Sequence, residues 1–345
     1  MNHRMLPSKN ITPEDMQDHL DSLAHRLAVN TLSEMVFPQF FQIETIRNCN
    51  AHCRFCAVDR WDMSNPQLPQ FLFDKIVEEM RDYRHWIRMV DVQRAGEPLL
   101  DKHLSQRISQ LKNIGIRFVT VSTNASLLNE KTATRLLDSG LDEIMISIDS
   151  VDKEIYESLR VGLNYETVIT NIKNFFALRD KQCPELVIRV RGVSCFRPDD
   201  PENQKQIQNW TRFWDEFRRP QDRIYMKKLH TWGNQHIWQE KISEYEHNLD
   251  YKPCIAPWST FHVTSMGRVP LCGQDMDATM TMGDIHNQTI AEIWQGEHFS
   301  RIRELHQIGQ RNEISFCRGC KIFDPDASLE QANHPKGYFP IPINK

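Results

Sequence analysis

The sequence predicts an α/β fold in which six parallel strands form a partial (β/α)6 barrel, followed by a small cysteine-bearing region. Short runs of β-branched or apolar residues alternate with helical patterns at intervals of roughly 25 to 35 residues, as in consecutive βα units. The 345 residues, 40% of them hydrophobic, suffice for one large domain or two ordinary ones. Parallel strands joined by right-handed crossovers can curl in this way, and the chemistry of such barrels lies at the carboxyl ends of the strands.

The predicted strands are short apolar segments separated by amphipathic helical patterns. We expect strands at residues 41–47, 88–94, 117–123, 143–149, 186–192 and 223–229. The helical patterns between them include FDKIVEEMRDYR, HLSQRISQLKNIG, EKTATRLLDSG and YETVITNIKNFFALR, and two of these end at a glycine that can serve as a C-cap.

The segments outside the barrel are predicted from caps and composition. Residues 12–36 form an amphipathic helical pattern with Thr12 as N-cap and Pro13 in the first turn, which we interpret as a helix covering one edge of the sheet. The predicted organisation is an N-terminal helical extension, the barrel, a linker, a second cysteine region and an irregular tail, at residues 1–38, 39–232, 233–253, 254–324 and 325–345.

Composition narrows the class of protein. The formal net charge of -4 and the isoelectric point near 6.4 argue against a nucleic-acid partner. The sequence shows neither a signal peptide nor an apolar run of about 18 residues, so we expect a cytoplasmic protein that does not enter a membrane. Nine cysteines in such a chain indicate metal or redox use rather than a disulfide framework.

The first cysteine motif is Cys49, Cys53 and Cys56, in the spacing C-x3-C-x2-C directly after the first predicted strand. Three thiolates can hold three irons of a 4Fe-4S cluster and leave the fourth iron open to another ligand. A zinc site is the alternative, and it would need His52 or a distant residue as its fourth ligand.

The second set consists of four cysteines, Cys254, Cys272, Cys317 and Cys320. Four protein ligands make a closed site, which can be either structural zinc or a fully ligated iron-sulfur cluster. The residues between Cys272 and Cys317 place apolar side chains at helical spacing, which predicts core packing around this site.

Four motifs in chain order together resemble the radical SAM superfamily. They are the C-x3-C-x2-C loop with Phe55 before its last cysteine, then AGEPLL at 95–100, STNASLL at 122–128 and SIDSVDKEIYESLR at 147–160. The last three follow the second, third and fourth predicted strands and are similar to the family's GGEP, TNG and SIDG segments, with Ala95 and Ala125 in place of glycines. The resemblance covers about residues 40–230. A noncatalytic iron-sulfur electron carrier or redox sensor is the remote alternative, and it has no use for the last three motifs.

This resemblance implies a partial TIM barrel that binds S-adenosylmethionine at the open iron of a 4Fe-4S cluster held by the first three cysteines. It implies that the backbone at Phe55 meets the adenine, that Gly96 and Glu97 receive the methionine amino group, that Ser147 reaches the ribose and that Arg160 binds the carboxylate. Apart from the family, Glu97 could cap a helix, Ser147 could be a core hydroxyl and Arg160 could lie on a solvated helix face. A flavodoxin or ferredoxin-type protein is the implied reductant.

The C-terminal region resembles the SPASM auxiliary-cluster domain, with MGRVPLC and FCRGCKIF as landmarks. The cysteines that this family carries after its C-x2-C pair are missing, so we expect one auxiliary 4Fe-4S cluster. In cysteine count and spacing the region is similar to the shorter twitch domain of the radical SAM dehydrogenase that oxidises an amino-cyclitol. The resemblance implies oxidation of a small-molecule alcohol such as a sugar or cyclitol. A peptide-modifying enzyme is the alternative. A small molecule is favoured over a peptide because residues 1–38 look too short and too helical for a leader-peptide-binding domain.

Candidates for the reaction itself lie at the carboxyl ends of the last two predicted strands. Cys195 could return a hydrogen atom to a substrate radical, which would make the protein an epimerase, or it could be a small buried side chain. Arg191, Lys227 and His230 are the candidates for a base in a dehydrogenation. Glu44 and Gln93 are predicted from strand position to face the cavity, without a role.

Overall fold

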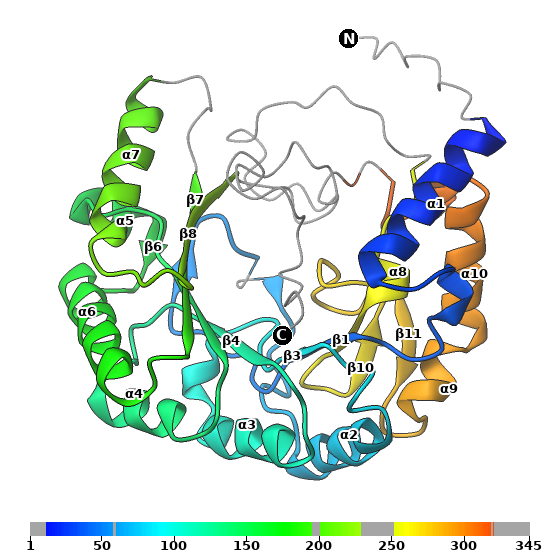
Figure 1. The fold of residues 1–345 in the computed structure, drawn as a ribbon, viewed down its shortest axis with the longest axis horizontal. Coiled ribbons are helices and arrows are strands. Elements are labelled where there is room, and N and C mark those ends of the chain that lie inside the picture. The colour runs from blue at the N-terminus through cyan, green and yellow to red at the C-terminus, as the bar shows by residue number, and fades with distance from the viewer. Residues whose placement is uncertain (1–11, 58–59, 195–200, 229–251, 319, 321–345) are drawn as a thin grey trace.

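The computed structural model describes residues 12–57, 60–194, 201–228, 252–318 and 320. Its main element is a seven-stranded parallel sheet in the order β8-β7-β5-β4-β3-β1-β9. All six predicted strands are present, as β1 (Phe40–Ile43), β3 (Met89–Asp91), β4 (Val119–Thr123), β5 (Glu143–Ser147), β7 (Val187–Ser194) and β8 (Arg223–Lys228). Figure 1 shows the sheet curling with its helices on the outside, so the predicted partial barrel is confirmed.

The helices that follow the strands cover the outer face of the sheet. They are α2 (Gln70–Asp82), α3 (Leu104–Asn113), α4 (Glu130–Leu137), α5 (Lys153–Leu159), α6 (Tyr165–Gln182) and α7 (Pro201–Asp215). Alternate strand residues such as Val90, Val121 and Ile144 join the apolar faces of these helices in one buried core. Since side chains alternate along a strand, the intervening polar residues point to the inner face, which we call the lumen. The lumen side of the barrel is therefore polar.

The seventh strand, β9 (Thr260–Val263), comes from the C-terminal cysteine region and was not predicted. It pairs in parallel with β1, so that His262 lies beside Gln42. The same region adds the short helix α8 (Ala256–Ser259), the hairpin of β10 (Arg268–Pro270) and β11 (Thr281–Asp284), and the helices α9 (Ile290–Trp294) and α10 (Glu297–Gln307). The apolar side chains predicted to pack here are buried: Ile290, Ile293, Trp294, Phe299, Ile302 and Leu305. The C-terminal region thus extends the barrel sheet.

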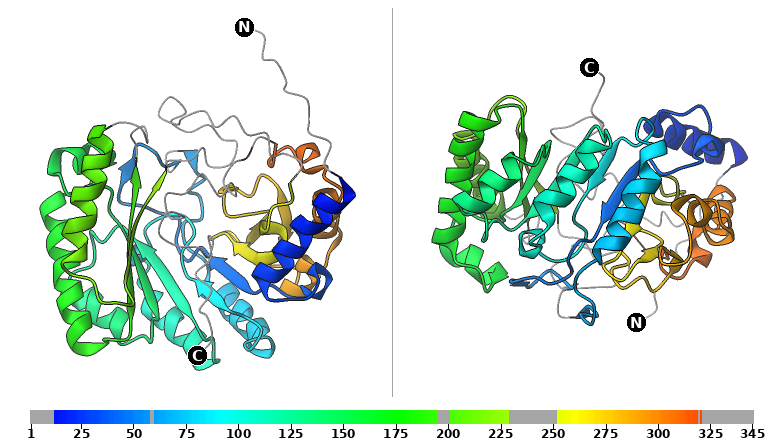
Figure 2. Two further views of the ribbon diagram at one scale, coloured as in Figure 1. Left: turned by 45° about the horizontal axis from the view of Figure 1, so that its top comes forward. Right: turned by 90° about the horizontal axis from the view of Figure 1, so that it is seen from below.

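The N-terminal helix is shorter than predicted. Helix α1 (Pro13–Leu27) begins at the predicted N-cap Thr12, where Thr12 and Asp15 form a capping box. It ends at Leu27 because Ala28 adopts the left-handed conformation with φ of 57°, and a separate 3-10 turn follows at Leu32–Glu34. Leu23 and Leu27 pack with Phe40 of β1 and with Trp258 of α8. Figure 2 shows α1 beside the C-terminal region, at the β1 side of the sheet.

Among the described residues, no helix is both long enough and apolar enough to cross a membrane.

Candidate active site

The loop with the first three cysteines follows β1 and is held against the end of α5. The two-residue strand β2 (His52–Cys53) pairs antiparallel with β6 (Arg160–Val161), and the backbone N–H of Arg54 donates to the carbonyl of Leu159 at 3.0 Å. Cys49, Cys53 and Cys56 are all partly buried on this loop. The predicted cysteine loop is therefore a fixed part of the barrel rim.

The thiols of this loop suit a site for positively charged iron. Burial raises the pKa of Cys49 to about 11, and the neighbouring charges of Glu97 and Cys53 add to the effect. Burial also raises the pKa of Cys53. Such thiols keep their protons unless a metal replaces them, because only a bound cation compensates for burying several thiolates together. The donor set fits an iron-sulfur cluster.

The second motif lies directly on the cysteine loop. Gly96 has a φ of 74°, and a Cβ at this position would lie 2.6 Å from the carbonyl oxygen of Asn48. Only glycine fits such a close approach with a left-handed backbone. The backbone N–H of Glu97 then donates to the same Asn48 carbonyl at 2.8 Å. The AGEP turn thus supports the backbone one residue before Cys49.

The Glu97 carboxylate is buried and joins the second motif to the third. It accepts hydrogen bonds from the Thr123 hydroxyl at 2.6 Å, from the backbone N–H of Asn124 at 2.7 Å and from that of Leu99 at 3.0 Å. Burial raises its pKa. Glu97 therefore caps the 3-10 turn Pro98–Leu100, as its alternative interpretation had it. The role of Gly96 and Glu97 toward the methionine amino group stays a prediction.

The third motif holds the cysteine loop from the next strand. The Asn124 side chain donates to the Asn50 side chain at 3.0 Å, and Asn50 donates to the Ser126 hydroxyl at 2.8 Å. Ala125, which replaces the family's glycine, is wholly buried and has a left-handed φ of 60°. The turn therefore keeps the geometry that glycine provides, at an energetic cost.

The fourth motif places a buried cation beside the cysteines. Arg160 donates from Nε and Nη2 to the Asp149 carboxylate at 2.6 and 3.1 Å, while its Nη1 lies 4.0 Å from Cys53 Sγ. Its guanidinium carbon lies 5.4 Å from the centre of the Phe55 ring. Burial lowers the pKa of Arg160, but the charges of Asp149 and Cys53 outweigh it and raise the pKa above its ordinary value. Arg160 is not on a solvated helix face, and its role toward a carboxylate stays a prediction.

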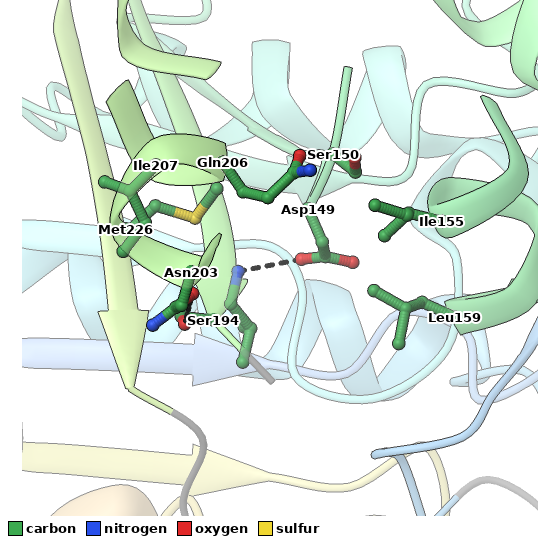
Figure 3. Close-up of a pocket in the computed structure, with 10 residues that line it drawn as sticks. Asp149, Ser150, Ile155, Leu159, Ser194, Asn203, Gln206, Ile207 and Met226 are labelled. Carbon is green, nitrogen blue, oxygen red and sulfur yellow. Dashed lines mark hydrogen bonds between the residues drawn. The ribbon is translucent and has the colours of Figure 1, made fainter. Parts of the chain in front are cut away.

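A pocket opens beside these motifs at the carboxyl ends of β5 and β7 (Figure 3). Asp149 contributes one carboxylate oxygen that accepts from the backbone N–H of Val193 at 2.8 Å. The lining mixes apolar and polar side chains, which suits the flat face and polar edge of a nucleoside. Its residues are Asp149, Ser150, Ile155, Leu159, Val193, Ser194, Asn203, Gln206, Ile207 and Met226. Most of these were not predicted, since α7 and β8 reach the pocket only through the tertiary fold.

The predicted substrate-side residues are only partly described. The Arg191 guanidinium donates to the Ser147 hydroxyl at 3.3 Å, and Ser147 is buried. Lys227 Nζ lies 5.8 Å from the centre of the Tyr225 ring. Cys195 and His230 lie outside the described residues, so their roles stay predictions. The role of Ser147 toward the ribose also stays a prediction.

The four C-terminal cysteines lie close enough in the fold for their charges to act on one another. Burial raises the pKa of Cys272 to about 12, with the charges of Cys320 and Cys254 adding to the effect. Cys317 has its pKa raised by burial and by the charges of the same group. Arg311 donates to the carbonyls of Cys317 at 3.3 Å and of Cys320 at 2.8 Å, which fixes the C-x2-C turn. Four thiols that interact in this way fit a fully ligated cluster.

Glu44 lies in a buried ion network and not in an open cavity. It pairs with Arg47 at 3.0 Å and with Arg94 at 3.2 Å, and all three side chains have no exposed surface. Arg94 donates to the carbonyls of Asp275 and Met276, and Arg47 also donates to that of Met276. The network therefore ties the segment after Cys272 to the strand that precedes the first cysteine loop.

Comparison with known protein families agrees with this geometry. Residues 43–183 match the radical SAM superfamily, and residues 254–321 match SPASM, an iron-sulfur cluster-binding domain. The chain is a radical SAM protein with a SPASM domain. These domains imply S-adenosylmethionine on a 4Fe-4S cluster and an auxiliary iron-sulfur cluster, and both cysteine sets of this radical SAM protein fit such groups.

Curated relatives of this radical SAM protein include cyclases. A probable GTP 3',8-cyclase of Methanococcus maripaludis strain S2 is 26% identical over 210 residues, which are 55% of this chain and 69% of the relative. The GTP 3',8-cyclase of Limosilactobacillus fermentum is 27% identical over 164 residues, 44% of this chain and 46% of the relative.

Solved structures share the fold at low identity. BtrN, in complex with AdoMet and 2-DOIA, has a TM-score of 0.54 and 16% identity, and the match covers 82% of this chain and 92% of BtrN. Streptococcus suis SuiB, bound to the precursor peptide SuiA, has a TM-score of 0.60 and 16% identity, over 89% of this chain and 78% of SuiB. These likenesses establish the fold and leave the reaction to the site.

Proposed function

We propose that this radical SAM enzyme dehydrogenates a small-molecule alcohol, such as a sugar or cyclitol. When bound, S-adenosylmethionine supplies a 5'-deoxyadenosyl radical that abstracts a substrate hydrogen, and a four-thiolate auxiliary cluster supplies a one-electron acceptor. The chain itself has to bind the alcohol, exclude water and accept the hydroxyl proton. The proposal is supported by the place of the second cysteine set relative to the barrel lumen.

The observation that carries the proposal is the contact of the segment after Cys272 with the lumen. A Cβ on Gly273 would lie 3.0 Å from His262 Cε1 and 3.1 Å from Gln42 Oε1, two side chains on the lumen faces of β9 and β1. The auxiliary cysteine Cys272 is thus adjacent in sequence to a residue that packs on the lumen face of the sheet. A cluster with four protein ligands has no vacant iron for substrate, so a place at this wall favours electron transfer over binding.

The proposal is tested by product analysis in deuterated water. The reconstituted protein is incubated without oxygen with S-adenosylmethionine, a ferredoxin-type reductant and the small-molecule extract of a source strain that lacks the gene. We expect 5'-deoxyadenosine and a product two hydrogens lighter than a compound of the extract, without new carbon-bound deuterium. A matched reaction with the Cys49→Ala, Cys53→Ala, Cys56→Ala protein should give neither.

Other outcomes would contradict this function. An epimer carrying one new carbon-bound deuterium, lost in Cys195→Ala, would indicate epimerisation. A modified peptide as the only product would indicate a peptide-modifying enzyme. Turnover of added GTP would place the chain with its cyclase relatives, and failure to form 5'-deoxyadenosine would exclude the radical chemistry.

A further inference from the structure

Asp91 is a buried carboxylate on the lumen face of β3 with one oxygen unused. The residue is 8% exposed, and its Oδ2 accepts a hydrogen bond from the Gln42 side chain of β1 at 3.3 Å. Its Oδ1 is buried and has no hydrogen-bond partner among the residues the structure describes. A buried carboxylate oxygen without a partner is costly, so it indicates that a donor is missing from this position.

Three more buried polar atoms, on the lumen-facing sides of other strands, also have no hydrogen-bond partner among the described residues. Ser122 Oγ of β4, His262 Nδ1 of β9 and Arg191 Nε of β7 all lack partners within the described part of the chain. Each such atom loses its hydration on burial and gains no hydrogen bond in return, which is unfavourable. Four of them around one lumen are best explained by a ligand with several hydrogen-bonding groups, which an alcohol with neighbouring hydroxyl or amino groups provides.

The charges around Asp91 leave it able to accept a proton. Burial raises its pKa to about 7, against the opposing effects of the Gln42 hydrogen bond, of the charges of Arg189 and Arg191 on β7 and of a hydrogen bond from the Gln93 backbone. Arg189 is itself paired with Glu143 of β5. Burial and the charge of Arg94 lower the pKa of His262 well below its ordinary value, so the imidazole of β9 is neutral. A carboxylate with this pKa is suited to general base catalysis near neutral pH.

We propose that Asp91 is the base that accepts the hydroxyl proton of the substrate, with Gln42 orienting the carboxylate so that Oδ1 receives it. The inference rests on the proposed dehydrogenation. In that reaction the carbon loses a hydrogen atom and one electron to the two cofactors, and the hydroxyl loses its proton to Asp91, so that a C=O bond forms. The cationic side chains of Arg191 and Lys227 suit the developing negative charge instead.

Asp91 also lies near the residues predicted to bind the cofactor. Arg191, whose charge acts on Asp91, donates to the hydroxyl of Ser147 at 3.3 Å. Ser147 is the residue that the family resemblance assigns to the ribose of S-adenosylmethionine.

The test compares Asp91→Asn with the wild-type holoenzyme. We expect the variant to keep its iron content, the electron paramagnetic resonance spectra of both clusters and the slow cleavage of S-adenosylmethionine without substrate. Formation of the lighter product from the same small-molecule extract should fall at least about 100-fold, the usual contribution of a general base. Asp91→Glu should recover part of the rate, and wild-type product formation should rise as pH increases through about 7, a dependence absent in Asp91→Asn.

Asp222→Asn serves as the matched control. Asp222 is a buried carboxylate at the opposite end of the barrel, paired with Arg179 at 2.6 Å, and the substitution should leave the rate of the lighter product unchanged. Asp91→Asn forming that product at the wild-type rate would overturn the inference. Loss of the clusters or of substrate-free cleavage in Asp91→Asn would also overturn it, since Asp91 would then be structural. Absence of 5'-deoxyadenosine with the wild-type protein would contradict the proposed function itself.

Discussion

Arg160 and Cys53 face each other across the two-residue pairing of β2 with β6, with Arg160 Nη1 4.0 Å from Cys53 Sγ. The other two nitrogens of this guanidinium bind Asp149. A permanent positive charge is thereby fixed beside the first cysteine loop, with one nitrogen directed to the side where the family resemblance places the carboxylate of S-adenosylmethionine.

Replacing Arg160 should therefore separate cofactor binding from cluster formation. We expect Arg160→Lys to keep the first cluster but to bind S-adenosylmethionine about 10- to 100-fold more weakly. A lysine ammonium group cannot form two parallel hydrogen bonds to Asp149 and at the same time bind a second carboxylate. The affinity is measured from the change in the cluster's electron paramagnetic resonance spectrum on titration. The matched control is Arg107→Lys. Arg107 is also buried and paired with a carboxylate, that of Asp101, but it has no proposed role in the site. Equal affinities of Arg160→Lys and wild type would refute this role.

Metal content should distinguish the two cysteine sets. Reconstituted wild-type protein should contain about eight iron and eight sulfide ions per chain, since the ligands suffice for two 4Fe-4S clusters. Replacing Cys49, Cys53 and Cys56 with alanine should leave about four iron and abolish 5'-deoxyadenosine formation, and replacing Cys317 and Cys320 should remove the other four. Stoichiometric zinc in place of half the iron would show that the C-terminal set is a structural zinc site.

The left-handed alanine of the third motif offers a stability test. Ala125→Gly should raise the free energy of unfolding by about 1 kcal/mol, because glycine adopts a φ of 60° without the steric cost that a Cβ brings. Ala133→Gly is the control, since Ala133 is buried within the regular helix α4 and the same substitution should destabilise there by a similar amount. Chemical denaturation measures both. A destabilising Ala125→Gly would mean that the methyl group packs better than its backbone strain costs.

The raised pKa of Asp91 should be visible in the pH dependence of stability. Below about pH 3 the carboxyl is protonated in both the folded and the unfolded chain, so wild type and Asp91→Asn should differ little. As pH rises toward about 7, the unfolded carboxyl ionises while the folded one resists, so wild type should lose stability relative to the variant. The loss is on the order of 4 kcal/mol and levels off above that pH. Melting temperatures of the two proteins between pH 4 and 8 check this, and parallel curves would contradict it.

Errors at the edges of the fold have local physical causes. The predicted helix over 12–36 is too long because its apolar spacing continues past Leu27, while Ala28 leaves the helical conformation and Thr31 and Glu34 form a new capping box. The TLSE signal for that second cap is present in the sequence.

The position of Asp91 on the lumen face could also be predicted from the sequence. It lies between Val90 and Val92 in a predicted strand, and the alternation of side chains puts it on the face opposite to the core. The alternation of side chains does not predict that Asp91 Oδ1 lacks a hydrogen-bond partner. That depends on Gln42 from another strand and on the arginines of β7, which only the folded chain brings near it.

The sequence by itself determined the barrel strands, the three-cysteine loop and the order of the four motifs, because hydrophobic period and ligand spacing are local properties of the chain. Only the tertiary structure decided that β9 pairs with β1, more than 200 residues away in sequence. The same holds for the close approach of Gly273 to Gln42 and His262 at the lumen wall, and for the hydrogen bonds between the Glu97 carboxylate and the third motif. These contacts join segments whose separation in sequence carries no periodic signal. They form because buried polar groups on the inner face of a parallel sheet take hydrogen-bond partners from whichever strand lies beside them.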